Sequence, residues 1–204
     1  MIKARHHWFY VRFFRFYTRW MLARHFRRVI LKGQFQDTGR PVLLVGNHFS
    51  WWDGFFAHCL NEKLFHKRFH VMMLEQQLRP RMFLNKAGAF SIRKHSPSVL
   101  ESLHYTRRLL EDPHNLVAMF PQGKIHSMYD YPVKFEKGPV KILRGIEPQV
   151  RVFFMAALVD YFSHPKPSLT LAIEEYQPTD SIALEDMEEA FNHFLRRMIQ
   201  DQHE

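Results

Sequence analysis

The chain has 204 residues, of which 46% are hydrophobic and 24% charged, a composition that favours one globular domain and excludes a disordered chain. Its single cysteine, Cys59, excludes an internal disulfide framework and a cysteine-based zinc site. The net charge of +9 comes from one end, because residues 1–34 hold nine Lys or Arg and no Asp or Glu. The neutral remainder argues against a nucleic-acid-binding protein, and we expect no nucleic-acid partner.

Residues 5–28 have helical periodicity and predict an amphipathic helix. One predicted face is aromatic: Phe9, Phe13, Phe16, Tyr17 and Trp20. The opposite side is basic: Arg5, Arg12, Arg15 and Arg19. The arginines interrupt the segment too often for a signal peptide, and no stretch approaches the roughly 18–20 apolar residues of a membrane span.

An aromatic stripe backed by arginines is typical of a helix that lies in the membrane interface, where each basic residue near anionic lipid contributes about 1 kcal/mol. Two alternatives remain open: the stripe packs on the protein's own core, or it binds single-stranded nucleic acid. The membrane surface is favoured. We therefore predict a membrane-surface helix over residues 1–32 and one further domain over residues 33–204.

Short apolar runs alternate with helical patterns through the rest of the chain. Strands are predicted at residues 41–45, 69–75, 89–92, 116–120, 151–161 and 169–173. Helices are predicted at residues 53–60, 96–111 and 182–200. This alternation predicts a single α/β domain with a mostly parallel mixed sheet flanked by helices, in addition to the N-terminal amphipathic helix.

The first candidate site is the segment 47–53, which directly follows a predicted buried strand. Ligands of α/β proteins bind at the carboxyl edge of the sheet, where this segment lies. The carboxylate of Asp53 can orient the ring of His48 across the turn and leave its other nitrogen free as a general base. The spacing alone is weak, because 14 histidines make a His-x4-Asp match common by chance.

Three further segments combine glycine with basic residues. Segment 120–124 follows another predicted strand, and its Pro and Gly predict a tight turn with exposed backbone N–H groups beside a lysine. Segments 88–94 and 134–138 also join glycine to basic residues. Each of the three is, by itself, equally well or better explained as an ordinary turn or solvated loop.

Together and in this order, the four segments resemble the blocks of the glycerolipid acyltransferase superfamily, whose best-known members acylate 1-acylglycerol-3-phosphate. Asn47-His48-x4-Asp53 resembles the catalytic Asn-His-x4-Asp block. Residues 88–94 resemble the second block, usually Gly-x4-Asp-Arg, and residues 120–124 the third, usually Phe-Pro-Glu-Gly-Thr-Arg-Ser. Residues 135–138 resemble the Phe-Lys-x-Gly stretch that follows, and the apolar run 152–158 lies where the fourth block is expected.

The resemblance implies that His48 and Asp53 are the catalytic residues. Its other implied site residues bind substrate: Asn47, Arg93, Lys94, Pro121, Gln122, Gly123, Lys124, Lys137 and Gly138. Several of these depart from the usual pattern, since Gln122 replaces Glu, Lys124 replaces Thr and the pair at 93–94 replaces Asp-Arg. The catalytic pair is intact while the acceptor site is altered, so acyl transfer is implied without fixing lysophosphatidate as the acceptor.

The implied reaction moves a fatty acyl group from acyl-CoA or acyl-carrier protein to a hydroxyl of a lysophospholipid-type acceptor. The thioester is a co-substrate, and no cofactor or metal is expected. Two alternatives are transfer to another lipid acceptor, such as an amino-lipid or lipidic pigment, and a non-catalytic lipid-binding relative. The expected partners are a membrane surface with anionic lipids, the thioester donor and the lipid acceptor. We expect a peripheral or monotopic protein at the cytoplasmic face of the membrane.

Overall fold

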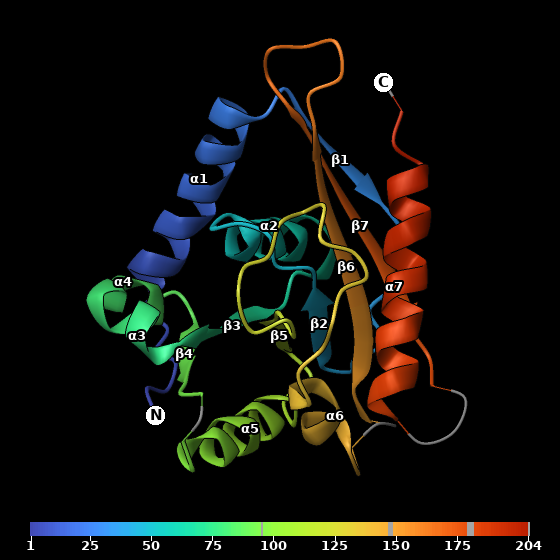
Figure 1. The fold of residues 1–204 in the computed structure, drawn as a ribbon. Coiled ribbons are helices and arrows are strands. Elements are labelled where there is room, and N and C mark those ends of the chain that lie inside the picture. Colours follow the sequence, from blue (N-terminus) through green and yellow to red (C-terminus); the bar gives the residue numbers. More distant parts are fainter. Residues whose placement is uncertain (95, 147–148, 179–181, 204) are drawn as a thin grey trace.

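The computed structural model describes residues 1–94, 96–146, 149–178 and 182–203. A seven-stranded sheet with the order β1-β7-β6-β2-β5-β3-β4 runs through the molecule (Figure 1). Its strands are β1 Arg28–Lys32, β2 Val42–Gly46, β3 Arg68–Leu74, β4 Ala89–Ile92, β5 Asn115–Met119, β6 Arg151–Asp160 and β7 Ser168–Tyr176. Only the β6–β7 pair is antiparallel among the described strands. The prediction of an α/β domain with a mostly parallel mixed sheet is confirmed.

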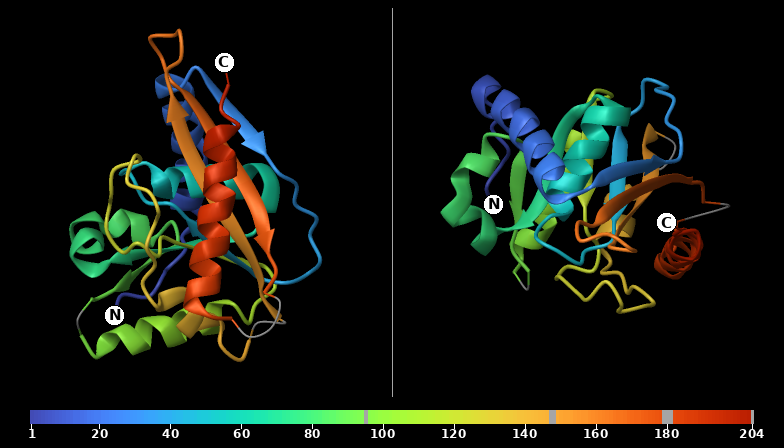
Figure 2. Two further views of the ribbon diagram at one scale, coloured as in Figure 1. Left: turned by 45° about the vertical axis from the view of Figure 1, so that its right-hand side comes forward. Right: turned by 90° about the horizontal axis from the view of Figure 1, so that it is seen from above.

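Helices cover both faces of this sheet. They are α1 Trp8–His25, α2 Asp53–Leu60, α3 Glu75–Leu78, α4 Met82–Asn85, α5 Ser98–Leu109, α6 Gly138–Leu143 and α7 Leu184–Gln200, with a π-helical turn at Asn61–Phe65 and a 3-10 turn at Arg79–Arg81. Helices α1 and α2 lie on one face, and α7 lies on the other (Figure 2). A parallel sheet covered in this way needs apolar residues on both sides of its strands.

Strand β2 illustrates how the sequence satisfies that need. All of its residues are buried. Because side chains alternate along a strand, Leu44 packs in the apolar cluster that contains Phe56 of α2, whereas Leu43 packs in the cluster that contains Phe191 of α7. A continuous apolar run in the sequence is therefore the signature of the central strand that carries the first candidate site.

The N-terminal helix is shorter than the predicted range 5–28. It begins at Trp8 and ends at His25, and the following Arg28–Lys32 segment forms strand β1 at the edge of the sheet, parallel to β7. Helical periodicity did not reveal this strand, because an edge strand depends on its partner: Val29 pairs with Leu169 of β7. The predicted domain boundary after residue 32 stays a prediction.

Helix α1 packs on the protein through a face that differs from the predicted aromatic stripe. Its buried residues are Phe14, Thr18, Met21 and Leu22. Phe9, Phe13, Phe16 and Trp20 of the predicted stripe are exposed. Tyr17 is the stripe residue that is half-buried, with its ring centroid 6.0 Å from that of Phe55, so most of the stripe does not contact the core. Within the described ranges, no helix combines the length and apolarity that crossing a membrane requires.

Candidate active site

The four predicted segments meet at one edge of the sheet. Strands β2 and β5 are parallel neighbours, so the segments that follow them leave the sheet side by side. Strand β3 pairs in parallel with β5, and β4 pairs in parallel with β3. The carboxyl ends of all four strands consequently lie along the same edge, which is where α/β sheets place their ligands.

His48 and Asp53 form a hydrogen-bonded pair at this edge. Asp53 is fully buried, and its Oδ2 lies 2.7 Å from His48 Nδ1. The same oxygen accepts hydrogen bonds from the backbone N–H groups of Phe49 at 2.8 Å and Ser50 at 3.0 Å, while the Ser50 hydroxyl donates to Oδ1 at 2.8 Å. As the first residue of α2, Asp53 also lies where the helix dipole favours an anion.

This network fixes the tautomer of the His48 ring. A carboxylate only accepts hydrogen bonds, so Nδ1 carries a proton, and in the neutral form of the ring Nε2 is the acceptor nitrogen. The ring stacks on Phe120, with centroids 4.8 Å apart, and its side chain is 25% exposed. The backbone is fixed as well: the N–H of His48 donates to Gln122 Oε1 at 2.6 Å, and its carbonyl accepts from the N–H of His126 at 3.0 Å.

Asn47 is held by a neighbouring strand. Its amide donates to the carbonyl of Ala157 in β6 at 2.9 Å, and its amide oxygen accepts the N–H of the same residue at 2.9 Å. Both hydrogen-bonding groups of the side chain are thus paired with backbone. These bonds tie the residue before His48 to β6, and the predicted substrate-binding role of Asn47 stays a prediction.

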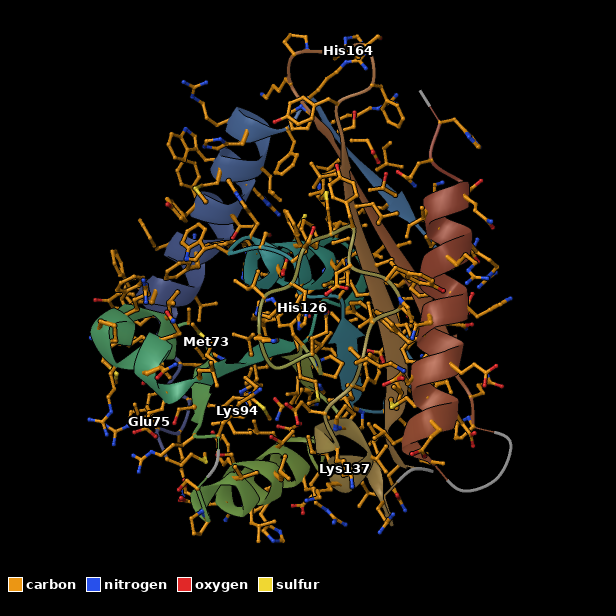
Figure 3. All side chains as sticks on the ribbon, viewed as in Figure 1. Met73, Glu75, Lys94, His126, Lys137 and His164 are labelled. Carbon is orange, nitrogen blue, oxygen red and sulfur yellow. The ribbon has the colours of Figure 1, made fainter. Side chains whose placement is uncertain are left out.

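A large cavity of about 890 Å³ opens beside His48. This volume lies near the upper end of the range of about 300–1,000 Å³ that is usual for small-molecule sites. Apolar side chains from several elements line it, including Phe14 of α1, Phe55 of α2, Met73 of β3 and Phe83 of α4. Met73 is labelled in Figure 3. A predominantly apolar cavity beside a His–Asp pair suits a substrate that has a hydrocarbon part.

The second and third predicted segments touch one another at this cavity. Gly123 has a φ of +67°, and a Cβ added there would lie 2.2 Å from Lys94 Nζ, so the lysine side chain rests on the turn. Lys94 Nζ also lies 3.2 Å from Glu136 Oε1. The N–H of Glu136 donates to the carbonyl of Pro121 at 2.8 Å, so the segment that contains Glu136 is bonded to the turn that contains Gly123. Any side chain at position 123 would displace Lys94 in addition to straining the backbone.

The predicted lysines at the cavity come from separate parts of the chain. Lys94 follows β4, Lys124 follows β5, and Lys137 precedes α6, yet all three line the cavity (Figure 3 labels Lys94 and Lys137). Gly138 lines it too, as does Lys141, which the sequence analysis missed. Their convergence gives the cavity a positively charged wall, which favours an anionic ligand group.

Arg93 lies outside this group of cavity residues. Its guanidinium is 2.7 Å from Oε1 of Glu75, an oxygen that also pairs with Arg79 at 2.7 Å. Oε2 of Glu75 accepts a hydrogen bond from the Ser91 hydroxyl at 3.2 Å. Arg93 and then Arg79 lower the pKa of Glu75 to about 2. Arg93 therefore fastens the end of β4 to β3, and Lys94, the next residue, is the cation that faces the cavity.

Replacing Glu75 with glutamine is expected to lower stability at neutral pH and to flatten its acid dependence. The folded-state pKa of about 2 lies below the ordinary value of 4.5, so the stabilisation is present above pH 4.5 and is lost as the pH falls toward 2. Urea unfolding of both proteins at steps between these values measures the difference. A gap between wild type and E75Q that stays constant down to pH 2 would contradict the assignment.

The aromatic residues that follow His48 have different positions. Trp51 and Phe55 line the cavity. Trp52 instead packs in the core, stacked parallel to Phe56 and edge-on to Phe26. The sequence alone did not show which of these residues line the cavity and which pack in the core, because all of them lie in one short apolar stretch.

A buried acid–histidine pair beside an apolar cavity, at the carboxyl edge of an open α/β sheet, is an arrangement suited to proton transfer on a substrate with an apolar part. The model of the Acyltransferase family matches residues 6–155, which is well over half of the chain. The protein therefore belongs to the acyltransferase family, and the resemblance to the glycerolipid acyltransferases is confirmed. The search of curated proteins found no match.

Proposed function

We propose that the protein transfers a fatty acyl group from acyl-CoA or acyl-carrier protein to the hydroxyl of a lysophospholipid-type acceptor, with His48 as general base. The observation that carries this proposal is the His48–Asp53 pair, whose 2.7 Å contact leaves Nε2 as the acceptor nitrogen of the neutral ring at the wall of the cavity. Membership of the acyltransferase family supports the reaction class. The donor, the acceptor and the role of His48 are our inference.

The reaction needs one proton acceptor and returns the same proton. His48 Nε2 takes the proton of the acceptor hydroxyl as its oxygen attacks the thioester carbonyl, and the positive imidazolium is stabilised by the carboxylate of Asp53. The tetrahedral intermediate then expels the thiolate, which receives the proton from His48. Backbone N–H groups of the Gly123 turn are suited to bind the negative oxygen. Ester and free thiol leave, and the pair returns to its starting state.

The acceptor headgroup is expected to be anionic. Lys94, Lys124 and Lys137 line the cavity and favour a phosphate or another anion. Gln122, in contrast, has its side-chain oxygen occupied by the N–H of His48. The replacement of the family's usual Glu at this position therefore acts on the catalytic turn, and we infer that headgroup choice depends on the lysines.

Thiol release from acyl-CoA, measured with liposomes and a panel of lyso-lipids, tests the proposed function. The expected result is release that depends on an added acceptor, together with an acylated product whose identity names the substrate. Release at an equal rate without any acceptor would indicate a thioesterase. No release with any acceptor, from either acyl-CoA or acyl-carrier protein, would favour a non-catalytic lipid-binding protein.

We further propose that α1 holds the protein at the membrane surface, on the cytoplasmic side where thioester donors are made. Its exposed face presents large aromatic side chains, with Phe16 70% and Trp20 52% exposed. Arg12 and Arg19 of the same helix are also exposed. Because Phe13 and Phe14 of α1 line the cavity, lipid at this face would lie close to the catalytic pair. Aromatic and basic groups together suit the interface of an anionic bilayer.

Replacing both Phe16 and Trp20 with serine is expected to weaken binding to anionic liposomes about tenfold or more, because two large apolar side chains no longer enter the interface. Liposome co-sedimentation measures the partition coefficient. Tyr129→Ser is the matched control, since Tyr129 is 88% exposed in the loop that leads to the α7 face of the sheet. Equal loss in this control, or no loss in the double variant, would exclude α1 as the docking helix.

A further inference from the structure

Two polar side chains interrupt the apolar wall of the cavity where α1 packs against α2. Thr18 of α1 is 2% exposed and His58 of α2 is 9% exposed, and both line the cavity. Within the described part of the chain, Thr18 Oγ1 and His58 Nδ1 have no hydrogen-bond partner. Buried polar atoms are nearly always paired in native proteins. The two atoms expose almost no surface themselves, so a ligand in the cavity reaches them when the Thr18 and His58 side chains turn toward it.

The surroundings of this polar pair are those of a hydrocarbon site. Phe14 and Tyr17 precede Thr18 on α1 and line the same cavity. On the other side, the ring of Phe69 meets the His58 ring edge-on, with centroids 5.2 Å apart. A ligand that reaches Thr18 and His58 is consequently surrounded by apolar side chains, apart from the one group that meets the pair.

His58 is neutral in this setting. Burial lowers its pKa to about 4, opposed by the charge of Glu62 and assisted by Arg15 and Arg19. Arg15 in turn pairs directly with Glu62, so this neighbouring acid already has a partner. A neutral imidazole has one donor and one acceptor, and a threonine hydroxyl has both functions as well. The pair is therefore matched to an uncharged hydroxyl and not to an anion.

We propose that Thr18 and His58 bind a hydroxyl group carried part way along an acyl chain in the cavity, so that the preferred donor is a hydroxyacyl thioester. This inference rests on the proposed acyl transfer. His58 lies five residues beyond Asp53 on α2, which is roughly 7.5 Å along the helix axis. Several carbons of the chain therefore separate the reacting carbonyl at His48 from the hydroxyl. Thr18 turns its hydroxyl toward the chain by changing χ1, since threonine in helices occupies two rotamers.

The test compares matched ligands that differ only in the hydroxyl. Dissociation constants for hexadecanoate, and for hydroxyhexadecanoates with the hydroxyl moved along the chain, are measured by titration calorimetry without any chemistry. Values of kcat/KM for the corresponding CoA thioesters are measured in parallel. We expect one mid-chain isomer to be preferred over the plain chain about tenfold or more, because a site with buried hydrogen-bonding groups discriminates against the analogue that leaves them unpaired.

Two variants test whether Thr18 and His58 cause the preference for the hydroxylated chain. Thr18→Val and His58→Phe keep the approximate shapes of the side chains and are expected to bring the ratio between hydroxylated and plain chains close to one. Thr106→Val is the control, because Thr106 is equally buried in α5 but its hydroxyl donates to the carbonyl of Ser102 at 2.9 Å. The ratio should be unchanged in this control.

The thermal stability of the two threonine variants tests whether each hydroxyl is paired in the folded protein. Thr18→Val should raise Tm, because a methyl group replaces an unpaired buried hydroxyl, whereas Thr106→Val should lower it. Equal dissociation constants for plain and hydroxylated chains would overturn the inference while leaving acyl transfer intact. A clear preference in binding without turnover of any thioester would instead support a hydroxyl-binding site at Thr18 and His58, and would refute both the proposed catalysis and the role of the hydroxyacyl thioester as donor.

Discussion

Replacing His48 with alanine is expected to lower kcat/KM for acyl transfer by about 10²–10⁴-fold, the usual contribution of a positioned general base. The His48 ring lines the cavity, held by Asp53 on one side and stacked on Phe120 on the other. Because its side chain is only 25% exposed and donates to the buried carboxylate of Asp53, its removal should also lower the free energy of unfolding, which is measured separately from the kinetic effect. Thiol release in the presence of the active acceptor, together with urea unfolding, measures both quantities.

Two other histidines serve as comparisons for His48. His104 is exposed on α5, and His104→Ala should keep full activity. His126 forms a second His–carboxylate pair, with Nδ1 2.8 Å from Asp130 Oδ2, but it does not line the large cavity. If His126→Ala lost as much activity as His48→Ala while both stayed folded, the assignment of His48 as the base would be wrong.

Replacing Asp53 with asparagine is expected to reduce kcat/KM by a similar factor of about 10²–10⁴, for a different reason. The amide has nearly the shape of the carboxylate, and its oxygen can accept from the N–H groups of Phe49 and Ser50 as Oδ2 does now. It has no negative charge, however, so the imidazolium that forms at His48 during the reaction loses its stabilising partner. The loss should appear in kcat, measured at saturating donor and acceptor.

Asp53→Ala separates this catalytic effect from a structural one. Removing the fully buried carboxylate leaves several hydrogen-bond donors without an acceptor, so the variant should lose about 3 kcal/mol or more of unfolding free energy, compared with a smaller loss in Asp53→Asn. Urea unfolding ranks the three proteins. An Asp53→Asn protein that keeps wild-type kcat would exclude the carboxylate's charge from the mechanism.

Most of the fold could be predicted because its elements have strong local signals. The buried runs at β2 and β5 are short, continuous and apolar, and α5 and α7 have clear helical periodicity, so their approximate positions followed from the sequence. Strand β1 and the short helices α3, α4 and α6 were missed. A four-residue helix has too few turns to show a period, and an edge strand forms only through its partner.

The candidate site divides along the same line. The sequence by itself predicted the His48–Asp53 pair, because the segment follows a strand and its order with the other segments resembles the family's blocks, and it placed lysines in those other segments. Only the tertiary structure decided which of these cations serve the cavity. Lys94 faces it while the adjacent Arg93 pairs with Glu75, because successive residues after a strand leave in opposite directions and Glu75 is brought there by β3.

The N-terminal helix shows the same division most clearly. Its sequence determined an amphipathic helix with aromatic and basic residues, but periodicity does not say which face meets the protein. The folded chain buries Phe14, Thr18, Met21 and Leu22 against the body of the protein and leaves Phe16 and Trp20 exposed. That choice packs α1 against α2 and brings Thr18 to the cavity that His58 of α2 also lines. Such a contact between distant segments depends on packing, which a linear pattern does not contain.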